Sequence, residues 1–500
     1  MSQATITILV LIGFISILLG IAKIASRSNV ATPKDFYLAN GGLGTIVMAM
    51  TMGSAYFSTW TLLGAIGQYY RDGVWFIAFA AWTVVHAMYM WIFGTKFWLL
   101  GRKYNFITPG DLIEKYYKSP MLHLIFAIVG IVGLVPYMLI QVTGGAMALE
   151  SLTNYSIPYW VGVLIMGVFV GIIVSASGGR GAAWSNTFMG VFFGSVLIFI
   201  VGFFIFKAGG LGAFKQIAKV APEVLVNKGE FWTIFETAVG LGVGFFIMPQ
   251  MWMGFYSMQS PQVIRKTTMI TPCWNSWIMA LGTLTIGILA HTPGLVPGIT
   301  PKLADRTIPI FFSSYAPVFG AVVIAAIVAA GISTINSALL GCASLFANDI
   351  YIRFFKKDAS PAQQTMIGKV MVIFLTIAVI LLAFIPAAQG YIVQVASVGY
   401  AILMQLVPSV VGAMFWKSGT RKAALTSVIS GELVVLIVYL FGSPFPMKAG
   451  ISGLTIAIIS YILVSIVSDD DEETKSVKAM FHHDLNRVFA LEDAQIISKK

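Results

Sequence analysis

The sequence predicts an all-α polytopic membrane protein, and two observations carry that prediction. Hydrophobic residues make up 58% of the 500 residues and charged residues only 10%, whereas a soluble domain carries roughly 25% charged residues. About thirteen apolar runs reach the length of about 20 residues that a helix needs to cross the hydrocarbon core. These runs lack sustained polar/apolar alternation, which disfavours a transmembrane barrel.

The predicted spans are separated by short polar or Gly/Pro-bearing breaks. They lie near residues 5–24, 44–68, 74–100, 121–150, 158–178, 187–208, 233–257, 270–291, 309–346, 366–388, 391–416, 423–443 and 448–467. We therefore expect a membrane domain over residues 1–467 and a tail over residues 468–500. The tail opens with the charge run SDDDEETK, which predicts a solvated, partly helical segment.

Lysine and arginine residues are distributed unequally between the two sides of the predicted membrane domain. If the first loop is cytoplasmic, that side receives about twice as many basic loop residues as the other. With thirteen spans, the N-terminus is then outside and the tail is in the cytoplasm. The net charge of +11 thus follows from topology, so we expect a lipid bilayer of the cell membrane as surroundings and no nucleic-acid partner.

The order of the spans predicts an internal inverted repeat. When the first span is set aside, spans two to six and seven to eleven form two groups of five, over about residues 44–208 and 233–416. Because five is odd, the two groups must run in opposite directions across the membrane. The first span of each group carries breakable sequence, MGSAYFSTWTLLGAIG and VGLGVGFFIMPQMWMG, and such paired breaks indicate a binding site at the midplane.

The stretch AAGISTINS, residues 329–337, places adjacent hydroxyls inside an apolar span. Most such hydroxyls simply bond to a carbonyl one turn earlier in their own helix. Ser333 and Thr334, however, lie on the same side as the Ala330 carbonyl, so three oxygens converge. A hard cation such as sodium prefers oxygen ligands, and unwinding of the second span around Ser54 to Phe57 would add further carbonyls.

At these residues the sequence resembles the sodium:solute symporter family, which includes sodium/proline, sodium/pantothenate, sodium/galactose and monocarboxylate carriers. Six segments appear in the family order: DFYLANGGLG, GSAYFSTWTLLGAIG, GRKYNFITPGDLIEKYY, GGRGAAWSNTFMG, MPQMWMGFYSMQSPQVIRK and AAGISTINSALLGCASLFANDIY. The resemblance implies a 5+5 inverted-repeat, LeuT-like core and sodium-coupled import of a small solute by alternating access. It also implies a sodium site made of the carbonyls of Ser54, Phe57 and Ala330 and the hydroxyls of Ser333 and Thr334.

Three positions depart from the family pattern. Tyr56 stands where the proline carriers have an acidic residue, Asn186 where many members have Asp, and Gln250 where His is common. The first two remove carboxylates associated with sodium coupling. We therefore expect one sodium ion per solute.

The candidate substrate residues lie beside the two predicted breaks. A helix N-terminus after the first break attracts anions, which favours a short monocarboxylate such as acetate, lactate or pyruvate. The candidate residues are Thr59, Trp60, Thr61, His86, Phe245, Phe246, Gln250 and Gln405.

Several alternatives stay open at this point. The same fold could be coupled to protons, for which His86 is the candidate titratable group. It could also carry an amino acid, a sugar or pantothenate with sodium. An enzyme is disfavoured because no nucleophile and base, or metal-binding cluster, is recognisable in the spans, and a channel because no selectivity filter is.

Overall fold

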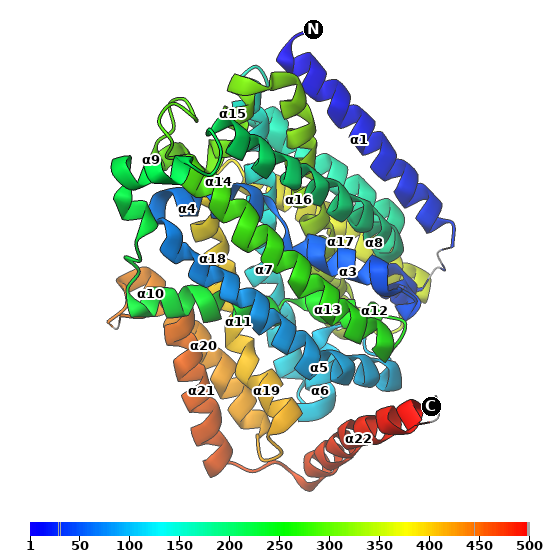
Figure 1. Cartoon of the computed structure of the whole chain (residues 1–500). Coiled ribbons are helices and arrows are strands. Elements are labelled where there is room, and N and C mark those ends of the chain that lie inside the picture. The colour runs from blue at the N-terminus through cyan, green and yellow to red at the C-terminus, as the bar shows by residue number, and fades with distance from the viewer. Residues whose placement is uncertain (29, 31, 445, 498–500) are drawn as a thin grey trace.

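The computed structural model describes residues 1–28, 30, 32–444 and 446–497, except for the side chains of residues 177, 275, 277, 279–281 and 487–497. Within that part of the chain the structure is helical, and a single bridge between Leu43 and Met258 is its one element of β pairing. The prediction of an all-α membrane protein is confirmed (Figure 1).

Ten helical segments are long and apolar enough to cross a membrane. They are α1 (Gln3–Ser26), η3–α5 (Val74–Tyr104), α7 (Pro120–Leu152), the two halves of α8 (Tyr159–Lys207), α16–η8 (Pro317–Ile352), α17 (Pro361–Leu382), α18–η10–α19 (Ile392–Phe415), α20 (Arg421–Phe441) and α21 (Ala449–Val467). The halves of α8 meet at Gly178, whose φ of 59° favours glycine, and a Cβ there would lie 2.8 Å from the Phe36 ring.

Two further spans are bent pairs, and both stand where the sequence predicted breakable helices. Helix α3 (Thr45–Tyr56) meets η2–α4 (Trp60–Asp72) at 51°, and α10–η5–α11 (Phe231–Phe246) meets α12 (Pro249–Ser257) at 54°. The predicted span 270–291 corresponds to the consecutive helices α13 (Pro261–Trp277), η6 (Ile278–Thr283) and α14 (Leu284–Leu289).

Shorter helices connect the spans. They are α2 (Pro33–Leu38), η1 (Ala39–Gly41), α6 (Pro109–Tyr117), α9 (Ala213–Val220), η4 (Pro222–Leu225), η7 (Pro301–Arg306), α15 (Thr307–Tyr315) and η9 (Pro386–Gln389). The tail forms α22 (Glu472–Ile497), and predicted tail residues 498–500 lie outside the described part of the chain.

The predicted span 309–346 has the wrong boundaries. Ala316 leaves the helical conformation, with φ −153° and ψ 64°, and separates α15 from α16. The cause is Pro317, because a proline disfavours the α conformation of the residue before it. The membrane span therefore begins at Pro317 and continues to Ile352.

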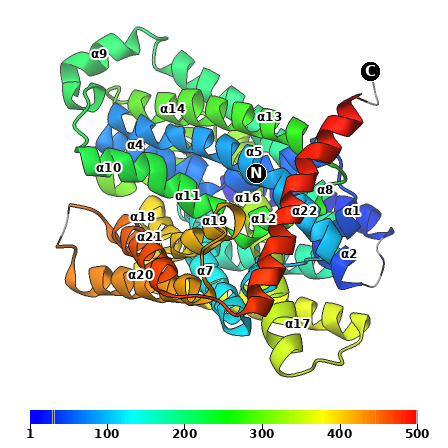
Figure 2. The same ribbon diagram turned by 90° about the horizontal axis from the view of Figure 1, so that it is seen from below.

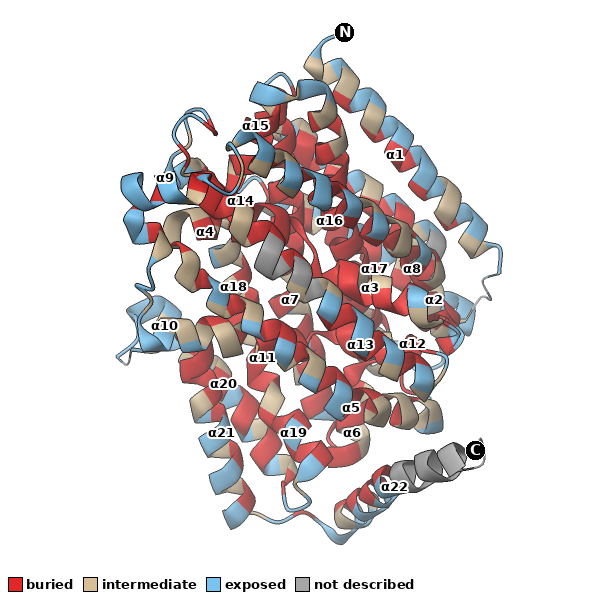
Figure 3. Cartoon of the chain, viewed as in Figure 1, coloured by how far each residue is buried: buried red, intermediate tan, exposed pale blue. Residues whose placement is uncertain are grey.

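The spans pack as two groups that meet at the bent helices. Helix α13 packs on α3 and α5, and α5 also packs on α11 and α12, whereas α7, α8, α16, α17 and α18 pack mainly on one another. Helix α3 also contacts α8 and α16 across the boundary. Figure 3 shows α16 as a largely buried helix, so polar groups on it face protein rather than lipid.

Candidate ion and substrate site

The break after α3 frees backbone carbonyls, and hydroxyl groups take them up. Helix α3 ends at Tyr56, and Phe57 is extended with φ −84° and ψ 104°, so the last carbonyls of the helix lose their amide partners. The Tyr137 hydroxyl donates to the Ala55 carbonyl at 3.0 Å, and Thr61 Oγ1 donates to the Tyr56 carbonyl at 3.4 Å. The carbonyls of Ser54 and Phe57 face α16 instead.

The two adjacent hydroxyls of α16 meet these carbonyls. Ser333 Oγ lies 3.0 Å from the carbonyl oxygens of both Ser54 and Ala330. Thr334 Oγ1 lies 3.0 Å from the Ala330 oxygen, 3.3 Å from the Ser54 oxygen and 3.4 Å from the Phe57 oxygen. The structure thus brings together the five oxygens that the sequence singled out, and each of these residues is buried.

This oxygen cluster has more acceptors than protons. Two hydroxyls supply two protons, yet five oxygen–oxygen contacts fall within hydrogen-bond distance, so three of them place lone pairs against lone pairs. A cation relieves that repulsion. Metal–oxygen bonds of about 2.3 to 2.6 Å, as calcium has, separate neighbouring oxygens of an octahedral site by about 3.3 to 3.7 Å. The shortest oxygen–oxygen distances in the cluster would therefore need to lengthen by a few tenths of an ångström to admit an ion.

Aromatic rings from both halves pack beside the two breaks. The Phe245 ring lies 5.1 Å from those of Tyr56 and Trp82 and 5.0 Å from that of Tyr400. We call the aromatic cluster the following rings, each joined to at least one other in the set: Tyr56, Trp82, His86, Tyr89, Tyr137, Phe245, Phe246 and Tyr400. Composition alone could not distinguish these rings from lipid-facing ones, because aromatics are 13% of the chain.

Among the described residues, several buried polar atoms near the two breaks have no hydrogen-bond partner. Three of them are Trp60 Nε1, His86 Nε2 and the Tyr89 hydroxyl. The other ring nitrogen of His86, Nδ1, is 2.9 Å from the Tyr56 hydroxyl. Buried polar atoms of this kind are costly to leave unpaired.

The remaining predicted substrate residues have different surroundings. Thr59 is fixed by α7, because its amide nitrogen lies 3.1 Å from Gln141 Oε1 and its hydroxyl 2.8 Å from the Ile140 carbonyl. Thr61 lies against the Tyr56 carbonyl. Both therefore hold the break in shape, and neither hydroxyl is free of protein contacts.

Gln250 and Gln405 lie apart from the aromatic cluster's unpaired atoms. Gln250 lines a separate small cavity with Asn186 and Ser337. Gln405 Nε2 donates to the carbonyls of Ala401 and Gly450 at 2.7 and 3.2 Å, so its side chain faces the contact with α21. The structure does not bring these two amides together with Trp60 or His86.

Asn186 connects directly to the oxygen cluster. Its Nδ2 donates to the Ser333 carbonyl and to Ser337 Oγ, each at 3.1 Å, and Asn336 Nδ2 donates to its Oδ1 at 3.3 Å. An amide donor thus occupies the place where a carboxylate would offer lone pairs to a second cation. These hydrogen bonds of the neutral Asn186 side chain could not be predicted from the sequence alone.

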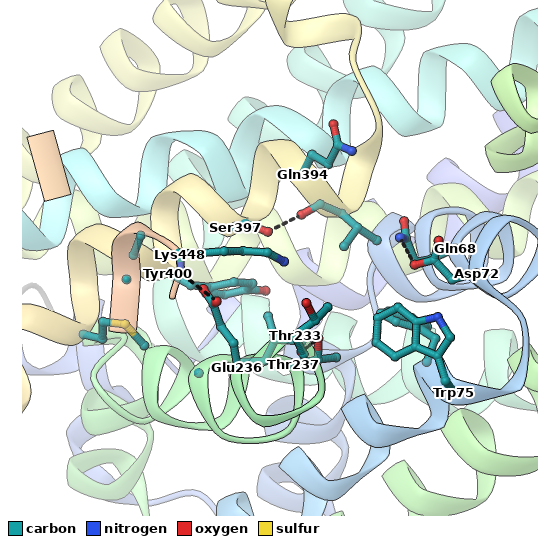
Figure 4. A pocket seen from close by; sticks show the side chains of 17 residues that line it. Gln68, Asp72, Trp75, Thr233, Glu236, Thr237, Gln394, Ser397, Tyr400 and Lys448 are labelled. Atoms are coloured by element: carbon teal, nitrogen blue, oxygen red, sulfur yellow. Dashed lines mark hydrogen bonds between the residues drawn. The ribbon is translucent and has the colours of Figure 1, made fainter. Parts of the chain in front are cut away.

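Two cavities approach the breaks from opposite ends of the protein. The larger, about 190 Å³, is lined by Asp72, Trp75, Glu236, Tyr400 and Lys448 among others (Figure 4). The smaller, about 60 Å³, is lined by Thr51, Asn186, Gln250 and Ser337 among others. Tyr400 belongs to both the larger cavity and the aromatic cluster, so that cavity ends at the cluster.

Sequence reasoning missed a buried charged network at the end of the protein that carries the tail. His123 at the start of α7 contacts two carboxylates: Nδ1 lies 2.6 Å from Glu114 Oε2, and Nε2 lies 3.0 Å from Asp349 Oδ1. Thr108 Oγ1 donates to Asp349 Oδ1 at 2.8 Å, and Arg353 pairs with Glu114. Only the separated motifs ITPGD and ANDIY could have signalled it.

Hydrogen bonds and ion pairs connect the residues of this network. The candidate ligand atoms of Asp111, His123 and Asp349 lie within 4.8 Å of one another. His123 Nδ1 also lies 2.6 Å from Arg353 Nη1, so this ring nitrogen faces both a carboxylate and a guanidinium. Hydrogen bonds to the carboxylates of Glu114 and Asp349 hold the ring in place.

A membrane fold with two bent spans, a convergent oxygen cluster and cavities from both ends defines a secondary transporter of the inverted-repeat class. The model of the sodium:solute symporter family matches residues 36–431. The chain belongs to this family.

Relatives and solved structures agree with that assignment. The chain is 26% identical to the sodium/pantothenate symporter of Escherichia coli, over 86% of this chain and 90% of that protein. It is also 26% identical to the sodium/proline symporter of Escherichia coli, over 82% and 83% of the two chains. A Na⁺-coupled sialic acid symporter in a substrate-bound outward-open state superposes with a TM-score of 0.79 at 18% identity, over 93% of this chain and 98% of that one. The fold is therefore the LeuT-like 5+5 repeat that the sequence predicted.

Proposed function

We propose that the protein imports a short monocarboxylate together with one sodium ion, with its N-terminus outside and its tail in the cytoplasm. The ion would be held by the carbonyls of Ser54, Phe57 and Ala330 and the hydroxyls of Ser333 and Thr334. The observation that carries this proposal is the excess of acceptor oxygens over protons in that cluster. Membership of a sodium symporter family supports the choice of ion.

The solute would lie between the breaks, against the aromatic cluster. The segment that restarts at Trp60 turns the positive end of its dipole toward the break, which attracts a carboxylate. Its first amide groups already bond to protein, since those of Thr59 and Trp60 donate to Gln141 Oε1 and Ser58 Oγ, so the attraction comes from the dipole. The unpaired Trp60 Nε1 and His86 Nε2 add donor capacity nearby. None of the residues in the aromatic cluster carries a permanent charge, which suits a small anion whose charge is balanced by the co-transported sodium ion.

A second candidate solute is a zwitterionic amino acid, because the aromatic cluster favours it. The faces of aromatic rings attract cations, and the rings of Trp82, Phe245 and Tyr400 pack within about 5 Å of a neighbouring ring in the cluster. A zwitterion could place its carboxylate at the helix N-terminus and its ammonium group against these rings.

Uptake into proteoliposomes distinguishes the two candidates. Sodium-driven uptake of radiolabelled acetate, lactate and pyruvate should exceed that of amino acids, and the amide of the preferred acid should compete weakly because it lacks the charge-assisted bond. Equal competition by acid and amide would contradict the carboxylate proposal. Uptake of amino acids without monocarboxylates would establish the second candidate.

The transported charge provides an independent check. One sodium ion with one monocarboxylate moves no net charge, whereas one sodium ion with a zwitterion moves one positive charge, which the membrane potential drives at about 2.3 kcal/mol per 100 mV. Solute-induced current should therefore be absent for the preferred acid. A robust inward current with two labelled sodium ions per acid would contradict the single-ion site.

A further inference from the structure

The tail helix α22 is docked on the protein by a buried apolar face. Phe481 is fully buried and Leu485 is 3% exposed. The Phe481 ring lies 6.4 Å from the Tyr104 ring, nearly parallel to it, and 5.1 Å from the Tyr116 ring. A tail that served only as a solvated end would not bury an aromatic side chain completely.

Polar contacts attach the same helix to the end of α5. Asp484 pairs with Lys103 and accepts a hydrogen bond from the Tyr104 hydroxyl at 2.5 Å. Burial alone would raise the pKa of Asp484, but the bonds to Lys103 and Tyr104 outweigh it and hold this pKa below its usual range. Asp484 is therefore charged at neutral pH.

A second set of contacts attaches α22 to α6 and to the loop between α19 and α20. The Tyr116 hydroxyl lies 3.0 Å from His482 Nε2, and Lys118 pairs with Glu473. The buried Lys478 pairs with Asp470 and donates to the Gly419 carbonyl in the loop. Its ammonium group also lies 5.1 Å from the centre of the Tyr116 ring.

These two attachment points belong to different packing groups. Helix α5 packs with α11, α12 and α13, whereas α6 is tied to α7 and η8 by the charged network around His123. Figure 2, seen from below, shows α22 lying across this end of the molecule. The tail therefore joins one group to the other at the end that is cytoplasmic in the proposed orientation.

We propose that α22 is a strap that opposes opening of the transporter toward the cytoplasm. In inverted-repeat transporters, access alternates when one group of helices rocks against the other. Opening at the tail end separates α5 from α6, so it must break the contacts of α22 on one side. Release of the strap shifts the protein toward the inward-open state without altering the oxygen cluster.

The test measures access to the small cavity from the tail side. Ala182, a buried residue that lines this cavity, is changed to cysteine in a Cys273→Ser background, because Cys273 is exposed and Cys342 is buried. Inside-out vesicles are treated with a membrane-impermeant maleimide. Lys103→Glu and Asp484→Lys should each raise the labelling rate by about threefold or more, because each variant loses a partly buried ion pair. The double variant with both substitutions, in which the two charges are exchanged, should restore the parent rate.

Hydrogen exchange of α22 and a matched control make the result decisive. Lys475→Glu reverses a charge that pairs with Asp469 and Glu472 inside the tail, and it should leave the labelling rate unchanged. Phe481→Ala provides a second way to release the helix. An unchanged labelling rate in variants whose α22 amide hydrogens exchange rapidly would contradict the strap. Unaltered exchange of the α22 amides in Lys103→Glu, Asp484→Lys and Phe481→Ala would contradict it as well. Neither readout depends on the identity of the solute.

Discussion

One continuous helix, α16–η8, carries two polar clusters of opposite character. Near its middle, Ser333 and Thr334 meet backbone carbonyls in a cluster without charge. At its end, Asp349 meets His123 and Thr108 in a cluster of charges. Both clusters are buried, so burial does not explain the difference between them.

The difference lies in the balance of donors and acceptors. The neutral cluster has two hydroxyl protons for five short contacts, so a cation, as we propose, would be accommodated among its oxygens. The charged network contains its own partners for the carboxylates, because Glu114 contacts Arg353 and His123, and Asp349 contacts His123. The first arrangement suits reversible ion binding, and the second suits permanent attachment of α6 to α7 and η8.

Removal of the charge at Asp349 should have the largest effect. Asp349→Asn preserves the side chain's shape but leaves His123 and Arg353 with one carboxylate fewer, and breaking a buried pair costs about 3 to 5 kcal/mol of stability. We expect a strongly lowered midpoint of thermal unfolding in detergent. The half-saturating sodium concentration of the folded fraction should stay unchanged, and a large change in it would show that the two clusters are not separate.

Changes in the neutral cluster should show the reverse pattern. Ser333→Ala with Thr334→Val removes two of five ligand oxygens at roughly 1 kcal/mol or more each, which raises the half-saturating sodium concentration at least about tenfold. Thermal stability should fall by less than in Asp349→Asn, because the buried carbonyls of Ser54 and Phe57 lose their hydroxyl donors but no buried charge loses its partner. A well-folded double variant with normal sodium dependence would exclude this cluster as the ion site.

Asn186→Asp introduces a charge beside the neutral cluster. The substitution replaces the amide donor to the Ser333 carbonyl and Ser337 with an acceptor, so a second cation becomes favourable there. Sodium dependence of uptake should change from hyperbolic to sigmoidal. Asn186→Ser, which is neutral, serves as the control, and an unchanged curve for the aspartate variant would show that its charge cannot recruit an ion.

The smallest expected effect concerns pH at the charged network. Burial would raise the pKa of Glu114, but the hydrogen bond and charge of His123 and the charge of Arg353 outweigh burial and lower this pKa. Because this pKa is lowered in the folded state, the charged Glu114 carboxylate stabilises the fold at pH values above the pKa of an unfolded carboxylate. This stabilisation is lost as the pH falls through the pKa of Glu114 in the folded protein. Glu114→Gln should flatten the acid side of the stability profile. An identical profile in wild type and variant would contradict the assignment.

The sequence predicted the convergence of the five oxygens better than the surroundings of the candidate solute residues, and the reason is physical. Ser333 and Thr334 lie on the same helix as Ala330, so helical geometry alone brings three of the oxygens together. The break itself lies at Phe57 to Thr59, slightly later than predicted, yet the Ser54 carbonyl is freed all the same. Local sequence therefore determines most of this cluster.

Long-range packing determines the rest. Gln405 was expected near the solute, but its amide turns toward Gly450 of α21, a choice that depends on a helix outside the repeats. Thr59 meets Gln141, and His123 meets Asp349, across large separations in sequence. No periodicity within one span could have predicted these contacts.

Equilibrium binding of radioactive sodium to the purified protein tests the central claim most directly, because it needs no solute. We expect one sodium ion per chain in wild type, loss of binding in the Ser333→Ala, Thr334→Val variant, and retained binding in the folded fraction of Asp349→Asn. Undiminished sodium binding by the double variant, or its loss on substitution of Asp349 alone, would contradict the assignment of the ion to the neutral oxygen cluster.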